Sequence, residues 1–352
     1  MANNCAQIPT DIAAKIAEHI ELFYSLSKRT YVKINLPSSI VGTDKDDQTR
    51  RYFSSHDWLI MESHNSRSRV TLFDPFSNNV IDPPGLPLHI FPYIDEWKDC
   101  MVTSHLGKFV LSTSPSKAND NDYMVAMLFG DLRQLAFWRP RQDTWVKPDS
   151  VAFNNGWFHD ACFFRGEFYV IDNASKLIAF GDLTTDIQNK LGRPPRVVAN
   201  LQDLMDFVEN GNLYLVEFES CLLALQREVF VKSYKKPKYE TTAFKMFKLN
   251  VDNGAAERIQ SLGNHAIFVG YNSTFVVRAS TNINDEHGGR CQADCIYSTD
   301  DAFELYHERK GGSDMGIYSL ALGKLVHYRH PFCEGPSRLS LVNPPIWVHF
   351  SV

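Results

Sequence analysis

Short apolar or alternating runs rich in Phe, Tyr, Val and Ile recur from about Tyr52 to the end of the chain, separated by Gly, Asn, Asp and Pro. Apolar runs of this length between turn residues are typical of antiparallel strands joined by tight turns. The pattern therefore predicts an all-β body. Its clearest strands are Asp57 to Met61, Val70 to Phe73, Phe109 to Ser112, Met124 to Phe129, Phe168 to Ile171, Leu213 to Phe218, Phe244 to Leu249, Ile267 to Val269 and Leu325 to Tyr328.

A Gly, polar residue and apolar strand recur in this order roughly every 45 to 60 residues, which is the kind of period that marks propellers and solenoids. The glycines are Gly107, Gly166, Gly211, Gly263 and Gly323. Dividing the body by a repeat of about 50 residues predicts a β-propeller of about six or seven blades. Residues 346–348 form a C-terminal strand that could close the ring, and a two-sheet sandwich is the alternative fold.

A second element also repeats: an apolar strand runs into a polar turn and then reaches a closing aromatic or aliphatic residue. It occurs in residues 71–80, 136–145 and 246–259. Trp138 and Trp145 belong to the second copy, and we interpret them as blade packing in preference to sugar-stacking residues.

The N-terminal segment differs from the body because Ile8, Ile12, Ile16 and Ile20 fall four residues apart. This spacing predicts one amphipathic helix of about three turns. The chain thus divides into a helical segment over residues 1–45 and a β-rich domain over residues 46–352.

The 352-residue chain contains 44% hydrophobic and 22% charged residues, which is the composition of an ordered globular protein. No apolar run is long enough to span a bilayer, and the acidic N-terminal segment argues against a secretory or transit signal. We therefore expect the protein in the cytoplasm or nucleus. Its net charge of -5 gives no general reason to bind nucleic acid, and its seven scattered cysteines predict free thiols in a reducing compartment.

Searches for chemistry find no GxSxG, GxxxxGK[ST] or HExxH motif. Cys291 and Cys295 with His287 could supply soft metal ligands, but a core position for Cys295 is the simpler interpretation. Asp300 and Asp301 suit either a cation-binding loop or a turn with Asx hydrogen bonds.

The neighbours His159 and Asp160 resemble part of a catalytic dyad, although adjacent side chains on a strand diverge, which favours a structural role. A lysine run over residues 232–238 suits a solvated hairpin loop, with an acidic partner as the alternative. We assign no catalytic, cofactor-binding or metal-binding residue and expect a non-enzymatic protein.

The N-terminal pattern resembles the opening helix of an F-box. Ile8-Pro9-Thr10-Asp11-Ile12-Ala13, followed by Ile16 and Ile20, is similar to the family's Leu-Pro, acidic residue and helically spaced apolar positions. The second half departs from it, since Tyr31-Val32-Lys33 replaces Val-Cys-Lys and Asn35 stands at the position of a Trp.

The body resembles the KIB-type β-propeller of plant F-box proteins. The similar segments, in chain order, are Leu72-Phe73-Asp74-Pro75-Phe76 with Ile81-Asp82-Pro83-Pro84, Asp160 to Asp172, Tyr214 to Glu217, Ser261 to Gly270 and Cys295 to Asp301.

This resemblance implies a substrate-receptor subunit of a Skp, cullin and F-box ubiquitin ligase whose propeller binds a target protein. Ile8, Pro9, Ile12, Ile16 and Ile20 would then meet the Skp-type adaptor, or alternatively pack the helix onto the propeller. Two other functions stay open: a propeller scaffold or decoy that does not bind the adaptor, and a small-ligand-binding or enzymatic propeller with its site in the central channel. The sequence names no target-binding residue.

Overall fold

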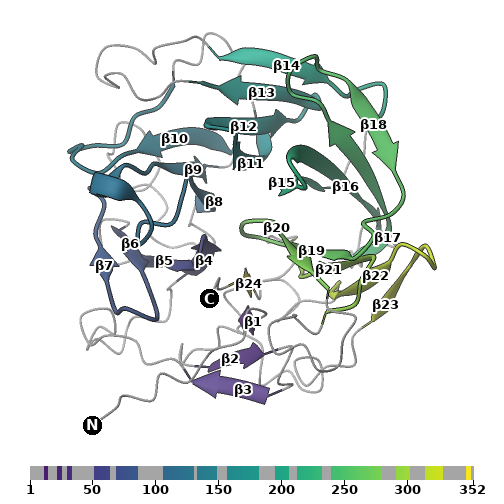
Figure 1. Cartoon of the computed structure of the whole chain (residues 1–352), viewed down its shortest axis with the longest axis horizontal. Helices are drawn as coiled ribbons and strands as arrows, with labels where there is room; N and C mark the ends of the chain where they lie inside the picture. The colour runs from purple at the N-terminus through teal and green to yellow at the C-terminus, as the bar shows by residue number, and fades with distance from the viewer. Residues whose placement is uncertain are drawn as a thin grey trace.

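The computed structural model describes fourteen stretches of the chain. These are residues 12–14, 22–25, 30–33, 51–63, 69–85, 106–130, 133–148, 157–181, 195–205, 212–231, 239–279, 291–301, 314–327 and 346–349. In the first three stretches the backbone is described without the side chains. The strands form sheets arranged in a ring about a central axis, which is the architecture of a β-propeller (Figure 1).

In the described part of the chain five blades follow one another, so the predicted count of six or seven blades is too high. The first two comprise β4 (Arg51–Ser55), β5 (Trp58–Ser63), β6 (Arg69–Phe73) and β7 (Val80–Ile81), then β8 (Leu106–Leu111), β9 (Val125–Phe129) and β10 (Gln134–Trp138). The third and fourth comprise β11 (Phe158–Phe164), β12 (Glu167–Asp172), β13 (Lys176–Phe180) and β14 (Arg196–Asn200), then β15 (Asn212–Phe218), β16 (Cys221–Val231), β17 (Tyr239–Leu249) and β18 (Ala256–Ile259). The fifth comprises β19 (His265–Val269), β20 (Phe275–Arg278), β21 (Cys295–Ser298), β22 (Gly316–Ser319) and β23 (Lys324–His327).

A sixth sheet joins the two ends of the chain. The C-terminal strand β24 (Ile346–Val348) pairs with β1 (Ile12–Ala14), which pairs in turn with β2 (Leu22–Ser25) and β3 (Thr30–Lys33). The register sets Ile12 opposite Val348 and Ala14 opposite Ile346. The predicted closing strand at residues 346–348 is therefore confirmed, and it closes the ring by pairing with a strand from the N-terminal segment.

The N-terminal helix predicted from Ile8 to Ile20 is wrong where the structure describes it, because Ile12–Ala14 form strand β1. Helix propensity is a weak prior that tertiary pairing overrides, and β1 has a partner strand on each side to take its backbone hydrogen bonds. Ile8, Pro9, Ile16 and Ile20 lie outside the described residues. The domain boundary between residues 45 and 46 stays a prediction.

All nine strands predicted in the body are present, as β5, β6, β8, β9, β12, β15, β17, β19 and β23. The second repeated element is also confirmed, because each copy connects the third strand of a blade to its fourth: β6 to β7, β10 to an isolated bridge at Val146, and β17 to β18.

The hydrophobic core lies in layers between adjacent blades. In β9, Val125 and Met127 pack with the first blade, whereas the alternating Ala126 and Leu128 pack with the third. Both faces of such a strand are buried, which explains why its sequence is a continuous apolar run. Trp138 and Trp145 are buried in the layer between the first two blades, so their predicted role in blade packing is confirmed.

Candidate functional site

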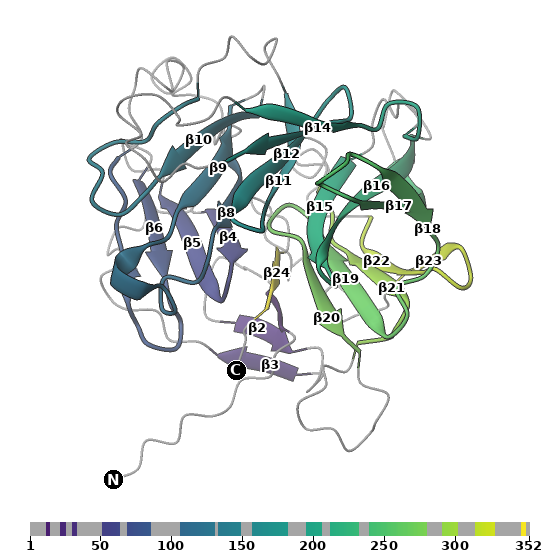
Figure 2. The same cartoon turned by 45° about the horizontal axis from the view of Figure 1, so that its top comes forward.

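The innermost strands of the ring surround the central axis, where propellers have a channel that can hold a binding site. Strands β4, β8, β11, β15 and β20 lie nearest the axis, as the tilted view of Figure 2 also shows. Strand β20 is an additional inner strand of the fifth blade and pairs with β19. On its other side, β19 pairs with β21, and these two strands run parallel.

The connection between β19 and β20, residues 270–274, fills the channel from the side. The Asn272 amide nitrogen donates hydrogen bonds to Ser54 Oγ at 2.6 Å and to the Trp347 carbonyl at 2.8 Å. Ser273 Oγ donates to the Phe109 carbonyl at 2.8 Å. These bonds tie the fifth blade to the first, to the second and to β24 across the axis.

A cavity of about 20 Å³ remains beside this connection. Its walls include Lys108, Arg133, His159, Asp160, Tyr214, Tyr271 and Asp301. This volume suits about one water molecule, whereas sites for small organic ligands occupy roughly 300–1,000 Å³. The polar groups near the axis therefore surround too little space for an organic ligand.

Asp160 connects the inner strands of three blades. One carboxylate oxygen forms an ion pair with Lys108 of β8, and the other accepts a hydrogen bond from the Leu215 N–H of β15 at 2.8 Å. Burial raises the pKa of Asp160, and the charge of Lys108 opposes that shift. Both side chains are almost fully inaccessible, so the pair is a structural link, as we predicted for Asp160.

His159, the neighbour of Asp160 on β11, lies at the rim of the same cavity. Burial, together with the positive charge of Arg133, lowers its pKa from 6.5 to about 4. The Arg133 guanidinium donates a hydrogen bond to the His159 carbonyl at 3.1 Å. The His159 ring stacks on Trp157 with a centroid separation of 5.7 Å and an interplanar angle of 19°. Trp157, His159 and Arg133 form what we call the rim cluster.

Arg227 links the fourth blade to the fifth from a fully buried position on β16. Its Nη1 donates to Asp301 Oδ1 at 2.9 Å and to the Thr299 carbonyl at 3.0 Å. Its Nη2 donates to a carboxylate oxygen of Asp314 at 2.9 Å and to the Asp314 carbonyl at 2.8 Å, and Nε donates to Thr241 Oγ1 at 2.7 Å. All five guanidinium donors are thus used.

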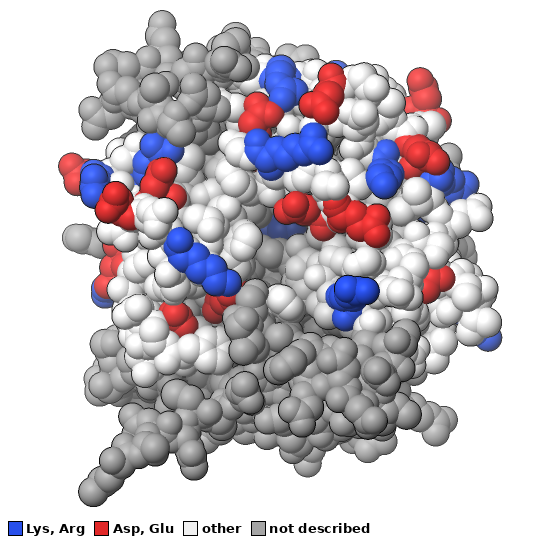
Figure 3. Space-filling view, viewed as in Figure 1, with Lys and Arg blue, Asp and Glu red and all other residues white. Residues whose placement is uncertain are grey.

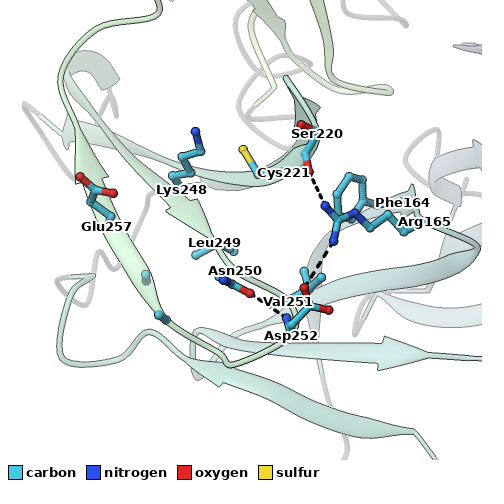
Figure 4. A pocket seen from close by; sticks show the side chains of 12 residues that line it. Phe164, Arg165, Ser220, Cys221, Lys248, Leu249, Asn250, Val251, Asp252 and Glu257 are labelled. Carbon is cyan, nitrogen blue, oxygen red and sulfur yellow. Dashed lines mark hydrogen bonds and ion pairs between the residues drawn. The ribbon is translucent and has the colours of Figure 1, made fainter.

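Two grooves flank the turn between β15 and β16. The first, of about 370 Å³, lies between the third and fourth blades, with Lys248 and Cys221 on one wall and Arg165 on the other (Figure 4). The second, of about 620 Å³, lies between the fourth and fifth blades. Arg165 is held by Asp252 and by the Ser220 carbonyl, so its charge serves a contact within the propeller.

On the face drawn in Figure 3, the charges of the described residues are mixed. Basic and acidic side chains alternate there without a large field of one sign. Among the described residues, no helix has the length and apolarity to cross a membrane.

The other predicted chemistry has separate outcomes. Cys291 and Cys295 are buried free thiols in the core of the fifth blade, and His287 lies outside the described residues. In the stretches that the structure describes, no group of three or more His, Cys, Asp or Glu side chains is arranged to hold a metal. The Lys run lies between the paired residues Val231 and Tyr239, outside the description.

The structure describes contacts of Asp300 and Asp301 that the sequence did not predict, while the cation-binding loop and the Asx turn both stay predictions. Asp301 pairs with Arg227 and accepts a hydrogen bond from the Tyr214 hydroxyl, and Asp300 accepts one from the Asp314 N–H at 3.4 Å. Arg227 is a buried cation on a distant strand, and local turn rules do not predict such a partner for Asp301. Of the five residues predicted to meet an adaptor, only Ile12 is described, and only as backbone in β1.

The sequence analysis missed Lys108, Arg133 and Arg227. The available signal for Lys108 and Arg227 was a charged residue inside an apolar strand run, since burial of such a residue requires a partner. The partners, however, lie 52 residues away for Lys108 and 87 residues away for Arg227 with Asp314, so the pairing could not be read locally.

The blades, their order and the closure by β24 define the class of protein: a β-propeller. The model of the KIB1-4 β-propeller family matches residues 23–319, and the chain belongs to that family.

The chain also has a low similarity to several solved structures. The N-terminal domain of Nup159 has 11% identity and a TM-score of 0.32 over 59% of this chain and 46% of that one. PorZ of Porphyromonas gingivalis has 10% identity and a TM-score of 0.39 over 84% and 34%, and the Cps50 (Swd1) β-propeller domain of Myceliophteria thermophila has 10% and 0.36 over 87% and 78%. The chain thus spans less than half of the first two. No curated protein matches the chain.

Proposed function

We propose that the chain is a non-catalytic protein-interaction propeller that holds a partner protein on its surface. The observation that carries this proposal is the narrow channel among the described residues: Asn272 and Ser273 bond to other blades there, and the cavity of about 20 Å³ described beside them is too small for an organic substrate. A propeller without room at its axis still offers a broad surface of loops for a partner.

The use of the charged groups near the axis supports the same function. Lys108 and Asp160 neutralise each other, and the donors of Arg227 are all used by acceptors in the fourth and fifth blades. A catalytic acid, base or nucleophile must reach a substrate, whereas these side chains are buried and paired with groups of the propeller.

Binding can be tested by reconstitution. Proteins retained on the immobilised full chain would be purified separately and titrated against it by calorimetry. Saturable binding of a purified protein is the expected result. The proposal fails if no retained protein binds when pure, or if the chain instead turns over a small molecule.

A second candidate is the substrate receptor of a Skp, cullin and F-box ubiquitin ligase, in the cytoplasm or nucleus. The F-box-like pattern over residues 8–20 favours it. The receptor would act by proximity, because it would hold a target lysine near the ubiquitin donor and raise its effective concentration. This role places Ile12 in a helix, whereas Ile12 pairs with Val348 in the closed ring, so adaptor binding would require the β1 pairing to open.

Co-purification with a Skp-type adaptor separates the two candidates. The full chain would be compared with the double variant Ile12→Asp, Ile16→Asp and with Val197→Asp, which changes an exposed side chain of β14. Binding by the wild type and Val197→Asp, with loss in a double variant whose circular dichroism and thermal unfolding are unchanged, would support the receptor role. If the wild type does not bind the adaptor under conditions in which an F-box protein does, the receptor role is wrong. The first candidate, an interaction propeller that does not bind the adaptor, would then remain.

A further inference from the structure

The rim cluster combines side-chain types that protein interfaces favour. Trp157 is 41% exposed although tryptophan is a large apolar residue. Both Trp157 and Arg133 contact His159, the first through its ring and the second through its backbone carbonyl. Trp and Arg, with Tyr, are the residues most enriched at binding hot spots.

Arg133 is held in position before any partner arrives. Its carbonyl accepts a hydrogen bond from the Phe158 N–H at 3.3 Å, and its guanidinium donates to the His159 carbonyl. Both contacts fix the β9–β10 turn against the start of β11. A group that is already ordered loses less entropy on binding, so it favours affinity.

The cluster carries positive charge that no described carboxylate neutralises. The nearby Asp160 is engaged by Lys108, and Asp172 accepts hydrogen bonds from the N–H groups of Ala174 and Lys176. Arg133 forms no ion pair with the residues that the structure describes, and its field disfavours a proton on His159. The cavity beside the cluster has room for about one water molecule, so it does not hold an organic ligand that could neutralise this charge.

We propose that the rim cluster is the docking site for an acidic, extended segment of a partner protein, with a carboxylate on Arg133 and a neighbouring apolar side chain against Trp157. This inference rests on the proposed function and adds the site and the chemistry of the partner. A carboxylate and a guanidinium form charge-assisted bidentate hydrogen bonds, and the indole adds apolar contact area.

The test uses the full chain as bait for a random peptide library displayed on phage. Asp or Glu adjacent to an aromatic or aliphatic residue should be enriched among the selected peptides. A synthetic peptide of the selected sequence should lose about tenfold or more in affinity on Arg133→Glu and on Trp157→Ala, with partial retention on Arg133→Lys. Binding to the wild type should also weaken as salt increases.

Two variants serve as matched controls. Arg278→Glu reverses an exposed arginine at the end of β20, and Phe76→Ala truncates an aromatic side chain that is 47% exposed between β6 and β7. Both should bind the peptide like the wild type, and all variants should keep the wild-type unfolding midpoint.

Each other outcome overturns the inference in a distinguishable way. The rim cluster is not the site if the selected peptides are basic, or if substitutions of Arg133 and Trp157 leave their affinity unchanged. Either result would leave the proposed interaction function intact. Absence of any selected peptide would overturn the rim site, and calorimetry with intact proteins would then decide the proposed function separately.

Discussion

Lys108 and Asp160 come from neighbouring blades and form an ion pair whose side chains are 7% and 1% exposed. The same carboxylate accepts the N–H of Leu215 on a third blade, so one acidic side chain coordinates three inner strands. Removing one partner of such a pair leaves a buried charge alone, which is far costlier than replacing both.

We therefore expect Asp160→Asn to lower the free energy of unfolding by about 3–5 kcal/mol, because Lys108 stays buried without its anion. Urea unfolding followed by fluorescence measures the change. The double variant Lys108→Met, Asp160→Asn should be more stable than Asp160→Asn alone. Asp252→Asn, which affects a side chain that is 79% exposed, should change stability by less than about 1 kcal/mol. Equal effects of the two Asp substitutions would contradict the structural role of Asp160.

The geometry around Arg227 leads to a second prediction. Arg227→Lys keeps the charge, but an ammonium has three donors in place of five and cannot bridge Asp301 and Asp314 as a planar guanidinium does. We expect a loss of about 3–5 kcal/mol in unfolding free energy, as for a broken buried pair. Arg196→Lys, at an exposed ion pair with Glu167, is the matched control and should be nearly neutral. A neutral Arg227→Lys would mean that the blades do not depend on this link.

A third prediction concerns pH. Because the pKa of His159 in the fold is about 4, against an ordinary value of 6.5, the unfolded chain binds a proton that the folded chain does not between these values. The contribution of neutral His159 to the free energy of unfolding is fully present above pH 6.5 and is lost as the pH falls toward 4. The free energy of unfolding changes in this range by at most about 1.4 kcal/mol per pH unit because of this group.

Other groups titrate in the same window, so the measurement is a comparison. Unfolding free energies of the wild type and His159→Asn would be determined from pH 7.5 down to the lowest pH at which both fold. The wild type should lose more stability than the variant over this range. Parallel curves would mean that His159 titrates normally in the fold.

The strands of the body could be predicted well from the sequence. A strand such as β9 is buried on both faces, so its sequence is an uninterrupted apolar run. The connections from third to fourth strand repeat visibly, since a strand, a polar turn and a closing apolar residue are all local features. The recurring glycines were less informative than their spacing suggested. Gly166 and Gly323 lie in turns with positive φ, whereas Gly107 lies within β8.

The contacts that define the candidate site were beyond local reasoning. Isoleucines four residues apart predict a helix, yet Ile12 pairs with Val348 at the other end of the chain. Likewise, Asp301 pairs with Arg227 on β16, a contact that the residues around Asp301 do not predict. In both cases a partner distant in sequence provides the interaction that decides the structure, and a single sequence does not reveal which distant residues meet.

The last prediction tests the connection that fills the channel. A Cβ added at Gly270 would collide with Thr299 Oγ1 and would also approach the ring of Trp347, at 3.7 Å from Cδ1. Overpacking of a buried site costs roughly 1–3 kcal/mol, so Gly270→Ala should lower the urea midpoint. Adding Thr299→Ala removes the oxygen that collides, and the double variant should therefore be less destabilised than the sum of the two single variants. Gly85→Ala is the control, because a Cβ there meets nothing within 4 Å. If Gly270→Ala and Gly85→Ala have the same small effect, the connection is not packed against Thr299. The channel would then be wider than the proposed function requires.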